Sequence, residues 1–314
     1  MLEVCLLGTS GMMPLPGRFL TSCLTRYNGF GLLIDCGEGT QVALRKRGLS
    51  CHDIDMILIT HTHGDHVSGL PGLLLSMGNA DRTEPVTIVG PKGTEAVVRA
   101  LCIIAPELPF EIRFQELSQP FETIPCREYT VEAFRVSHNI VCYGYSIVVR
   151  RQGRFRPEKA VENNVPMSMW NRLQKGQTIE EDGRVFTPDM ILGPERRGLK
   201  FTYCTDSRPT ASIVDAAKEA ESESAEEAAH LFVCEGMYGE PGMEKKARDH
   251  RHMTFAEAAT IAKEAGVREM WLTHYSPSLV HPEQYANDVR AIFPNTVISR
   301  DGQYVDLMFE DTEE

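Results

Sequence analysis

Four side chains of the kinds that bind metal ions lie within six consecutive positions, in the segment His61-Thr62-His63-Gly64-Asp65-His66. The segment follows an apolar, strand-like run, Met56–Thr60, and α/β proteins place their chemistry in loops at the carboxyl ends of strands. Imidazole and carboxylate groups together suit zinc, and manganese and iron bind at similar sites. Burying these groups without a metal would cost roughly several kcal/mol. Because the ligands are too many for one tetrahedral ion that keeps an open position, the segment predicts part of a two-metal site.

Three more ligand-type residues, His138, Asp206 and His274, are far apart in the sequence but have similar local settings. Each comes just after a short apolar or β-type run, so each can project from the end of a strand. We therefore expect all three to reach the same rim as residues 61–66.

Taken in order, these residues resemble the motifs of the metallo-β-lactamase superfamily. His-x-His-x-Asp-His after a strand is similar to the signature of that family, and Asp35, in Leu33-Ile34-Asp35, matches an aspartate that supports the metals. The resemblance implies two metal ions, which we expect to be zinc, with manganese or iron as alternatives. The implied ligands are His61, His63 and His138 for one ion, Asp65, His66 and His274 for the other, and Asp206 as the bridge between them.

The same resemblance implies a fold and a reaction. The fold is α/β, an αββα sandwich in which two central mixed sheets are flanked by helices. The reaction is hydrolysis of a phosphodiester by a hydroxide held between the two ions. A general acid then protonates the leaving oxygen.

Within the superfamily the chain looks most like the ribonuclease Z family, whose members trim the 3′ trailer from precursor tRNA. The similarity extends over essentially the whole length, and its supporting segments are Leu7–Ser10, Leu33–Gln41, Gly64–Gly72 and Tyr143–Ser146. By this resemblance His252 is the proton donor, Glu235 is the acidic partner that orients it and keeps it protonated, and Asp65 is catalytic as well as a ligand. A carboxylate within hydrogen-bond reach raises the pKa of a histidine, as a general acid requires.

The elements that must position these residues follow an α/β pattern. Strand-like runs occur at Leu2–Leu7, Gly31–Asp35, Met56–Thr60, Val86–Val89, Val131–Ser137, Tyr143–Arg151, Lys200–Thr205, Leu231–Val233 and Glu269–Thr273. Helices are expected at Thr40–Arg47, at Thr94–Ile104, and from the capping box Thr254-Phe255-Ala256-Glu257 to Gly266. Strands that feed helices in both halves predict a sheet core covered by helices, in a single domain spanning 1–314.

The segment 151–199 interrupts this pattern, because its periodicity is lost and several Pro and Gly appear. It falls where ribonuclease Z carries a protruding tRNA-binding arm, and its parts Val165–Gly176 and Glu181–Gly183 resemble the base of that arm. From Arg150 to Lys200 there are eleven Lys or Arg against seven Asp or Glu, whereas the rest of the chain is acidic. Either the segment is a solvated insertion whose charge bias is chance, or it approaches a polyanion as a basic arm. Trp170 either stacks on RNA or anchors the root of the arm.

Composition bounds the cellular setting. A net charge of −12 argues against general adhesion to nucleic acid or to an anionic membrane. Nine cysteines without a CxxC pair indicate free thiols in a reducing compartment. The chain shows no basic leader and no apolar run of roughly 20 residues, so we expect a cytoplasmic protein without a membrane anchor.

Three functional hypotheses remain open at this point. The first is an endoribonuclease that acts on precursor tRNA or another RNA phosphodiester, as a homodimer if it follows its superfamily relatives. The second is a phosphodiesterase for small or cyclic nucleotides on the same two-metal site. The third is a metal-loaded RNA-binding protein without turnover; a lactamase-like hydrolase of C–N or C–S bonds is a more distant option.

Overall fold

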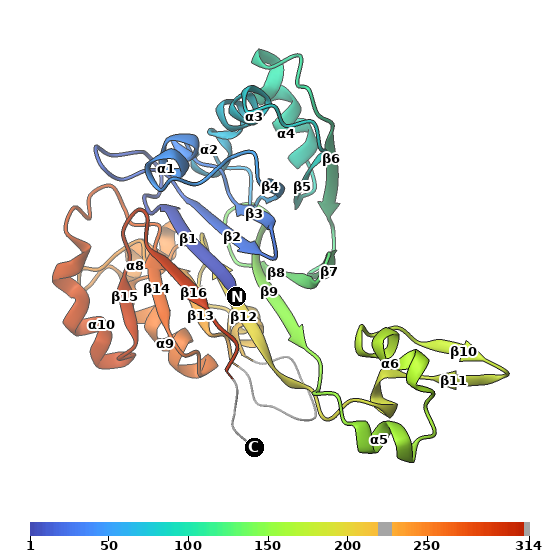
Figure 1. The fold of residues 1–314 in the computed structure, drawn as a ribbon. Helices are drawn as coiled ribbons and strands as arrows, with labels where there is room; N and C mark the ends of the chain where they lie inside the picture. Colours follow the sequence, from blue (N-terminus) through green and yellow to red (C-terminus); the bar gives the residue numbers. More distant parts are fainter. Residues whose placement is uncertain (219–227, 311–314) are drawn as a thin grey trace.

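The apolar runs of the first 120 residues form a seven-stranded mixed sheet that is completed by a strand from the far end of the chain (Figure 1). The structure is a computed structural model, and it describes residues 1–218 and 228–310. The strand order is β16 (Tyr304–Leu307), β1 (Leu2–Gly8), β2 (Ser22–Tyr27), β3 (Phe30–Ile34), β4 (Ile54–Leu58), β5 (Val86–Pro91) and β6 (Ile112–Leu117). The strands from β3 to β6 run parallel to one another, so their carboxyl ends meet at one edge.

A second seven-stranded sheet comes from the later part of the chain. Its order is β15 (Thr296–Ile298), β14 (Met270–Thr273), β13 (Leu231–Glu235), β12 (Arg196–Cys204), β9 (Cys142–Arg151), β8 (Tyr129–Val136) and β7 (Phe121–Cys126). The strands from β12 to β15 are parallel. β8 and β12 are both antiparallel to β9, so β8 ends at the same edge as β12.

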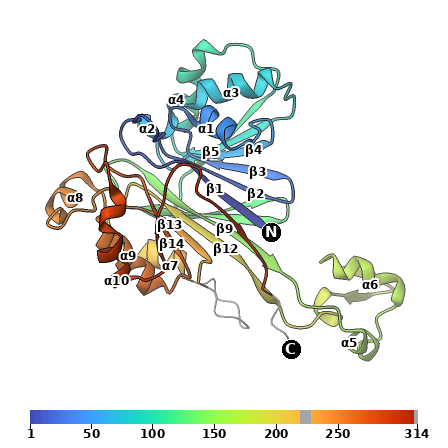
Figure 2. The ribbon, with the colours of Figure 1, turned by 60° about the vertical axis from the view of Figure 1, so that its left-hand side comes forward.

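Helices cover the outer face of each sheet (Figures 1 and 2). The first sheet is covered by α1 (Thr40–Lys46), α3 (Leu70–Asn79) and α4 (Thr94–Leu101), and the second by α7 (Ala211–Ala217), α9 (Phe255–Ala265) and α10 (Ala286–Ile292). Two further helices, α2 (Gly64–Val67) and α8 (Glu244–His250), carry or precede site residues. Across the described residues, no helix combines the length and apolar character that crossing a bilayer needs. The expected αββα sandwich is confirmed.

The two sheets are joined by a layer of buried, mostly apolar side chains. Trp271, Tyr143 and Tyr145 are fully buried there among aliphatic residues of both sheets. Each fully buried aliphatic side chain in this layer contributes roughly 1.5–3 kcal/mol by leaving water. The Tyr145 hydroxyl donates to the carbonyl of Ile59 at 2.7 Å, so its one polar atom is satisfied and links the second sheet to the residue that leads into the segment 61–66.

The predicted elements are present, with small shifts at their ends. Thr94–Ile104 was expected as one helix, but the α-helix ends at Leu101 and a single 3-10 turn, Cys102–Ile104, continues it. The capping box of Thr254 and Glu257 is formed as predicted. The strands β2, β6, β7, β15 and β16 were not predicted, and neither were two short strands between residues 179 and 186. In β6 and β7, charged residues and a proline interrupt the alternation of apolar and polar residues that predicts a strand.

The segment between β9 and β12 projects from the body as a separate arm (Figures 1 and 2). The two strands pair as far as Arg151 and Arg196, and the arm lies between these positions. It contains α5 (Pro157–Glu162), α6 (Met167–Gln174) and the hairpin of β10 (Ile179–Glu181) and β11 (Arg184–Phe186). The loss of periodicity in the sequence therefore hides short helices and strands.

The arm has its own small core, and Trp170 packs against it. Ala160, Leu173 and Ile191 are fully buried in it, and the half-buried Trp170 packs against Phe155 with ring centroids 5.1 Å apart. The indole N–H of Trp170 donates to a carbonyl of the arm at 3.0 Å. Of the two interpretations of Trp170, the structure favours the structural anchor.

One prediction about the arm was wrong. Glu181–Gly183 was expected at its base, but these residues end β10 and begin the turn at the far tip of the hairpin (Figure 1). Asp182 and Gly183 have φ values of 50° and 74°. Positive φ at both central residues is what a tight two-residue hairpin of an Asp-Gly pair requires, so the motif belongs to a tip.

Truncating the arm's core should loosen the arm without unfolding the body. We expect Leu173→Ala to lower the stability of the arm by roughly 2–5 kcal/mol, because a fully buried leucine is replaced by a cavity. Limited proteolysis should then cut between residues 152 and 195 at a much higher rate, while the melting temperature of the body changes little. Val161→Ala, at a side chain that is 67% exposed, is the matched control. Equal cleavage rates in the two variants would contradict the separate core.

Candidate two-metal site and proton donor

The predicted site residues meet at the edge where parallel strands of both sheets end. His61 follows β4 of the first sheet, and His138, Asp206 and His274 follow β8, β12 and β14 of the second. This convergence follows from strand direction, because parallel strands present their carboxyl ends at the same edge. All seven predicted ligands are brought together, and they form groups whose ligand atoms lie within 4.8 Å of one another.

Three residues at this edge adopt a left-handed backbone conformation, which is energetically unfavourable for residues other than glycine. Asp35, Asp206 and His274 have φ values of 58°, 51° and 58°. Each such residue costs roughly 1–3 kcal/mol unless the surroundings compensate, and such residues are concentrated at functional sites. For Asp35 the compensation is visible, since its carboxylate accepts from the main-chain N–H and the hydroxyl of Thr60 at 2.8–3.0 Å.

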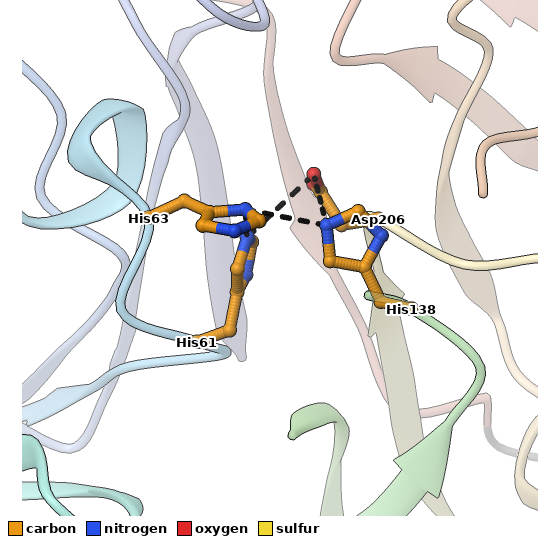
Figure 3. Close-up of side chains that lie close together, drawn as sticks. All are labelled: His61, His63, His138 and Asp206. Carbon is orange, nitrogen blue, oxygen red and sulfur yellow. Dashed lines mark hydrogen bonds and ion pairs between the residues drawn. The ribbon is translucent and has the colours of Figure 1, made fainter. Parts of the chain in front are cut away.

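The first ligand group is His61, His63, His138 and Asp206, whose side chains point toward one another in Figure 3. Nε2 of His61 and Nε2 of His138 lie 2.9 and 3.3 Å from Nδ1 of His63. Both Nε2 atoms lie 3.7 Å from Oδ2 of Asp206. A tetrahedral zinc ion with bonds of about 2.0–2.1 Å requires donor atoms about 3.3–3.4 Å apart, so the group has suitable dimensions.

The second ligand group is Asp65, His66 and His274, with Asp206 again at its side. Oδ1 of Asp206 lies 3.2 Å from Nε2 of His66 and 3.1 Å from Nε2 of His274. Oδ2 of Asp65 lies 3.6 and 3.9 Å from the same two nitrogens. One oxygen of Asp206 therefore faces each group, which is the geometry of a bridging carboxylate.

Three buried polar atoms at the centre of the second group have no hydrogen-bond partner among the described residues. They are Nε2 of His66, Nε2 of His274 and Oδ1 of Asp206. The other ring nitrogens are already used, because Nδ1 of His66 lies 2.8 Å from the Asp35 carboxylate and Nδ1 of His274 lies 2.6 Å from the Thr21 hydroxyl. Unpartnered buried acceptors that face a carboxylate repel one another unless a cation lies between them. The donor set thus fits divalent metal ions.

Local charge supports the same conclusion. Burial alone would lower the pKa of His66, but Asp35, Asp206 and Asp65 outweigh burial and raise it well above its usual value. Burial, reinforced by neighbouring histidines, lowers the pKa of His61 well below its usual value. A pocket with surplus carboxylate charge on one side and neutral imidazole on the other is suited to binding cations through deprotonated ligands.

Two histidines of the first group, His61 and His138, have a further contact at their other ring nitrogen. Nδ1 of His61 lies 3.1 Å from the Thr60 hydroxyl and 3.7 Å from the Cys142 thiol, and Nδ1 of His138 lies 3.2 Å from the carbonyl of Arg251. Such contacts fix the ring and its tautomer, and their loss typically weakens metal affinity by roughly 10–100-fold.

His252 and Glu235 form a buried pair beside the two groups. His252 is 9% exposed and Glu235 is fully buried, and Nδ1 of His252 lies 3.0 Å from Oε2 of Glu235. The His252 ring lies 5.3 Å from that of His138 and 5.7 Å from that of His274, measured between centroids, so it borders both ligand groups. Burial alone would lower the pKa of His252, but Glu235 and Asp206 raise it to about 9. Bound cations would oppose this shift, so a carboxylate partner is what keeps the ring protonated.

Asp65 is held at the open side of the site. The main-chain N–H of Met12, itself left-handed at φ 65°, donates to Oδ2 of Asp65 at 2.7 Å. Burial alone would raise the pKa of Asp65, but His66, His274 and this N–H lower it. The carboxylate is therefore ionised at neutral pH, able to bind a cation or accept a proton.

Several supporting residues were not predicted. Thr21 and Cys142 contact ligand rings, but hydroxyls and thiols are too common in the sequence to stand out. Gly11 is required because a Cβ there would lie 2.7 Å from Nε2 of His274. The only available signal was its place in the Thr-Ser-Gly turn after β1.

The chain is similar to known proteins over its whole length. A family model described as anti-Pycsar protein Apyc1 matches residues 2–152. The chain is 61% identical to ribonuclease Z of Lachnoclostridium phytofermentans over 313 residues, covering 100% of each protein. It is 47% identical to ribonuclease Z of Clostridium kluyveri over 314 residues, with 99% of this chain and 100% of the relative covered.

Solved structures share the fold. Human tRNase Z, short form, superposes with a TM-score of 0.69 at 24% identity, covering 98% of this chain and 100% of the human chain. The metallo-beta-lactamase fold protein YhfI from Bacillus subtilis gives a TM-score of 0.67 at 18% identity, with 97% and 98% covered. The sandwich described above is thus the metallo-β-lactamase fold.

The two groups should each hold one divalent ion. We expect elemental analysis of the purified protein to find two ions per chain, and close to one after either His63→Ala or Asp65→Ala, since each variant removes a ligand from one group only. Asp206→Ala should reduce the binding of both ions, because its two oxygens face different groups. His281→Ala, at a side chain that is 72% exposed, is the control. If Asp206→Ala retained both ions, the bridging geometry would be wrong.

Proposed function

The chain belongs to the ribonuclease Z family, and from this premise we propose that it is a metal-dependent endoribonuclease that removes the 3′ trailer of precursor tRNA. The single observation that carries the proposal is the Glu235–His252 pair beside the two ligand groups. Cleavage of an RNA phosphodiester expels a sugar oxygen, which is a poor leaving group unless it is protonated. A buried histidine held protonated at the rim of a two-metal site meets that need.

The ligand groups supply the metal part of the proposal. We propose zinc for both ions, since imidazole-rich sets with a carboxylate bridge suit it, with manganese or iron as alternatives. His61, His63 and His138 would hold one ion, Asp65, His66 and His274 the other, and Asp206 would bridge them. When bound, a pair of divalent ions lowers the pKa of water and neutralises charge on phosphoryl oxygens.

The residues of the chain then divide the proton transfers between them. Glu235 accepts from Nδ1–H of His252, which fixes the ring and leaves Nε2–H to protonate the leaving oxygen. Asp65, which is ionised and whose side chain is 12% exposed, can take a proton from the attacking water. Asp35 accepts from Nδ1–H of His66 and so leaves Nε2 of that ring free to bind a cation.

We propose that the arm, residues 151–199, contacts the RNA away from the cleavage site. The support is its projection from an otherwise acidic body and its surplus of Lys and Arg. Lys175 and Arg172 are exposed on it, and phosphate contacts by such side chains position RNA without reading its sequence. Because Trp170 packs in the arm's own core, we expect ion pairs between these side chains and RNA phosphates to contribute more than stacking of Trp170 on RNA bases.

We also propose that the protein is a cytoplasmic homodimer. All nine cysteines are free thiols and seven are buried, which suits a reducing compartment. Ile103 and Ile104 are 76% and 72% exposed, and their neighbours Cys102 and Ala105 line a cavity of about 550 Å³. Adjacent exposed isoleucines beside a hollow surface are typical of a protein contact.

Loss of the proton donor should separate turnover from binding. We expect His252→Ala to lower kcat on precursor tRNA by about 100- to 10,000-fold, because general acid catalysis supplies about that factor. Metal content and RNA affinity should stay close to wild type, measured by elemental analysis and filter binding. His250→Ala, two positions away and exposed, is the matched control. A kcat that survives His252→Ala would remove this residue from the mechanism.

Excising the arm should distinguish RNA processing from hydrolysis of small diesters. Because Arg151 and Arg196 are cross-strand partners, residues 152–195 can be replaced by a short Gly-Ser turn. We expect the shortened protein to lose cleavage of precursor tRNA by at least about tenfold in kcat/KM while it still hydrolyses bis(p-nitrophenyl) phosphate. Full tRNA cleavage without the arm would refute its role, and hydrolysis of small or cyclic nucleotides alone by the intact protein would favour the phosphodiesterase alternative.

The dimer can be checked by light scattering coupled to size exclusion. The intact protein should elute at twice the mass of one chain, and the double change Ile103→Asp and Ile104→Asp should shift it toward the monomer. Val161→Asp, on the exposed surface of α5, should not. A monomeric wild-type protein would end the dimer proposal.

A further inference from the structure

Arg208 connects the loop that carries Asp206 to His252, the proposed proton donor. It lies two residues after Asp206, and its side chain is 15% exposed. Nη1 donates to the main-chain carbonyl of His252, and the guanidinium pairs with both carboxylate oxygens of Glu257. Arginine forms such forked pairs with carboxylates in a fixed plane, which lysine cannot reproduce.

The segment that carries His252 lies between two helices. α8 is followed by Arg251, which is left-handed at φ 64°, and α9 begins after its N-cap, Thr254. The carbonyl of His252 precedes the N-cap, so it takes no part in the hydrogen-bond ladder of α9. The Arg208 guanidinium supplies a donor to that carbonyl. The position of the His252 main chain is therefore tied to a side chain from another part of the sequence.

Glu257 holds the arginine and the start of α9 at the same time. Its carboxylate accepts from the main-chain N–H of Thr254 at 2.9 Å, as part of the capping box, and it also accepts from Arg208. Burial alone would raise the pKa of Glu257, but Arg208 and Thr254 lower it, so the carboxylate is charged when it binds the arginine. Helix start, arginine and the His252 carbonyl form one connected unit.

The same stretch of chain also reaches the other partner of His252. The main-chain N–H of Ser207 donates to the carboxylate of Glu235, and the N–H of Arg208 donates to the carbonyl of Ser137 at 2.9 Å. Residues 206–208 thus contact the carboxylate that holds the His252 ring, the carbonyl of its main chain and the residue that precedes His138. These contacts link the position of His252 to that of Asp206 and His138.

We propose that Arg208, locked in place by Glu257, is a positioning residue for His252. Glu235 fixes the ring through Nδ1, and Arg208 fixes the main chain from which the ring extends, so that Nε2–H reaches the leaving oxygen. Displacement of a catalytic group by about 1 Å can lower the rate roughly 100-fold, so a restraint on the main chain of His252 would affect turnover. The inference rests on the proposed role of His252 as proton donor.

The test compares two substrates that differ in their need for a proton donor. Precursor tRNA expels a sugar oxygen that must be protonated, whereas bis(p-nitrophenyl) phosphate expels a nitrophenolate that leaves unprotonated. The variants are Arg208→Lys and Glu257→Gln, each made in the wild-type chain and in the His252→Ala chain, with all proteins metal-loaded. Arg26→Gln is the control, because Arg26 forms an ion pair with Glu3 between β1 and β2 of the first sheet, away from the site.

We expect Arg208→Lys to lower kcat on precursor tRNA by about tenfold to a hundredfold, with KM and the two bound ions unchanged. The fall on bis(p-nitrophenyl) phosphate should be much smaller. In the His252→Ala background, Arg208→Lys should have little further effect on tRNA, because residues that act through one group are not additive. Glu257→Gln should follow the same pattern more weakly, and Arg26→Gln should change neither activity.

Three outcomes would overturn the inference. Unchanged tRNA turnover in Arg208→Lys would show that His252 needs no such restraint. Equal losses on both substrates, accompanied by loss of metal, would make Arg208 a structural support of the Asp206 loop. A full further loss in the His252→Ala background would show that Arg208 acts independently of His252. Failure of the proposed function is recognised separately, since the wild-type protein would then not cleave precursor tRNA at all.

Discussion

The placement of one carboxylate, that of Asp206, is the constraint on which the rest of the site depends. Its two oxygens face different groups of histidines, so both groups must lie within reach of a single side chain. Asp206 follows β12 with a left-handed backbone, a conformation that needs support from its surroundings, and the main-chain N–H groups of Ser207 and Arg208 are bound to Glu235 and Ser137. The parallel strand directions of both sheets are what deliver the partner side chains to the same edge.

Much of this arrangement could be predicted from the sequence because the relevant side chains are chemically rare and follow apolar runs. His61–His66, His138 and His274 are recognisable in this way, and the ligand grouping came from a family resemblance that the geometry matches. Arg208, Thr21 and Cys142 could not be predicted, since arginine, threonine and cysteine occur throughout the chain and their roles depend on which distant loops meet. A hydrogen bond between Arg208 and a main-chain carbonyl leaves no trace in the spacing of residues.

The arm illustrates a different limit of sequence reasoning. Its core uses few apolar residues, such as Ala160, Leu173 and Ile191, separated by turns, so no window is long enough to show a helical or strand period. The surplus of Lys and Arg suggested a role for the segment, but it did not predict the core on which these side chains lie. In the structure the arm has a core of its own, and its exposed charged side chains lie on the surface of that core.

The division of ligands between the two sheets has a consequence for how the protein comes into being. The first sheet supplies His61, His63, Asp65 and His66, and the second supplies His138, Asp206 and His274. During synthesis the early histidines emerge first, and neither group is complete until the strands that precede Asp206 and His274 have been made. A nascent chain therefore carries only the residues from the first sheet, and we expect activity on RNA to arise only when the second sheet has folded against it.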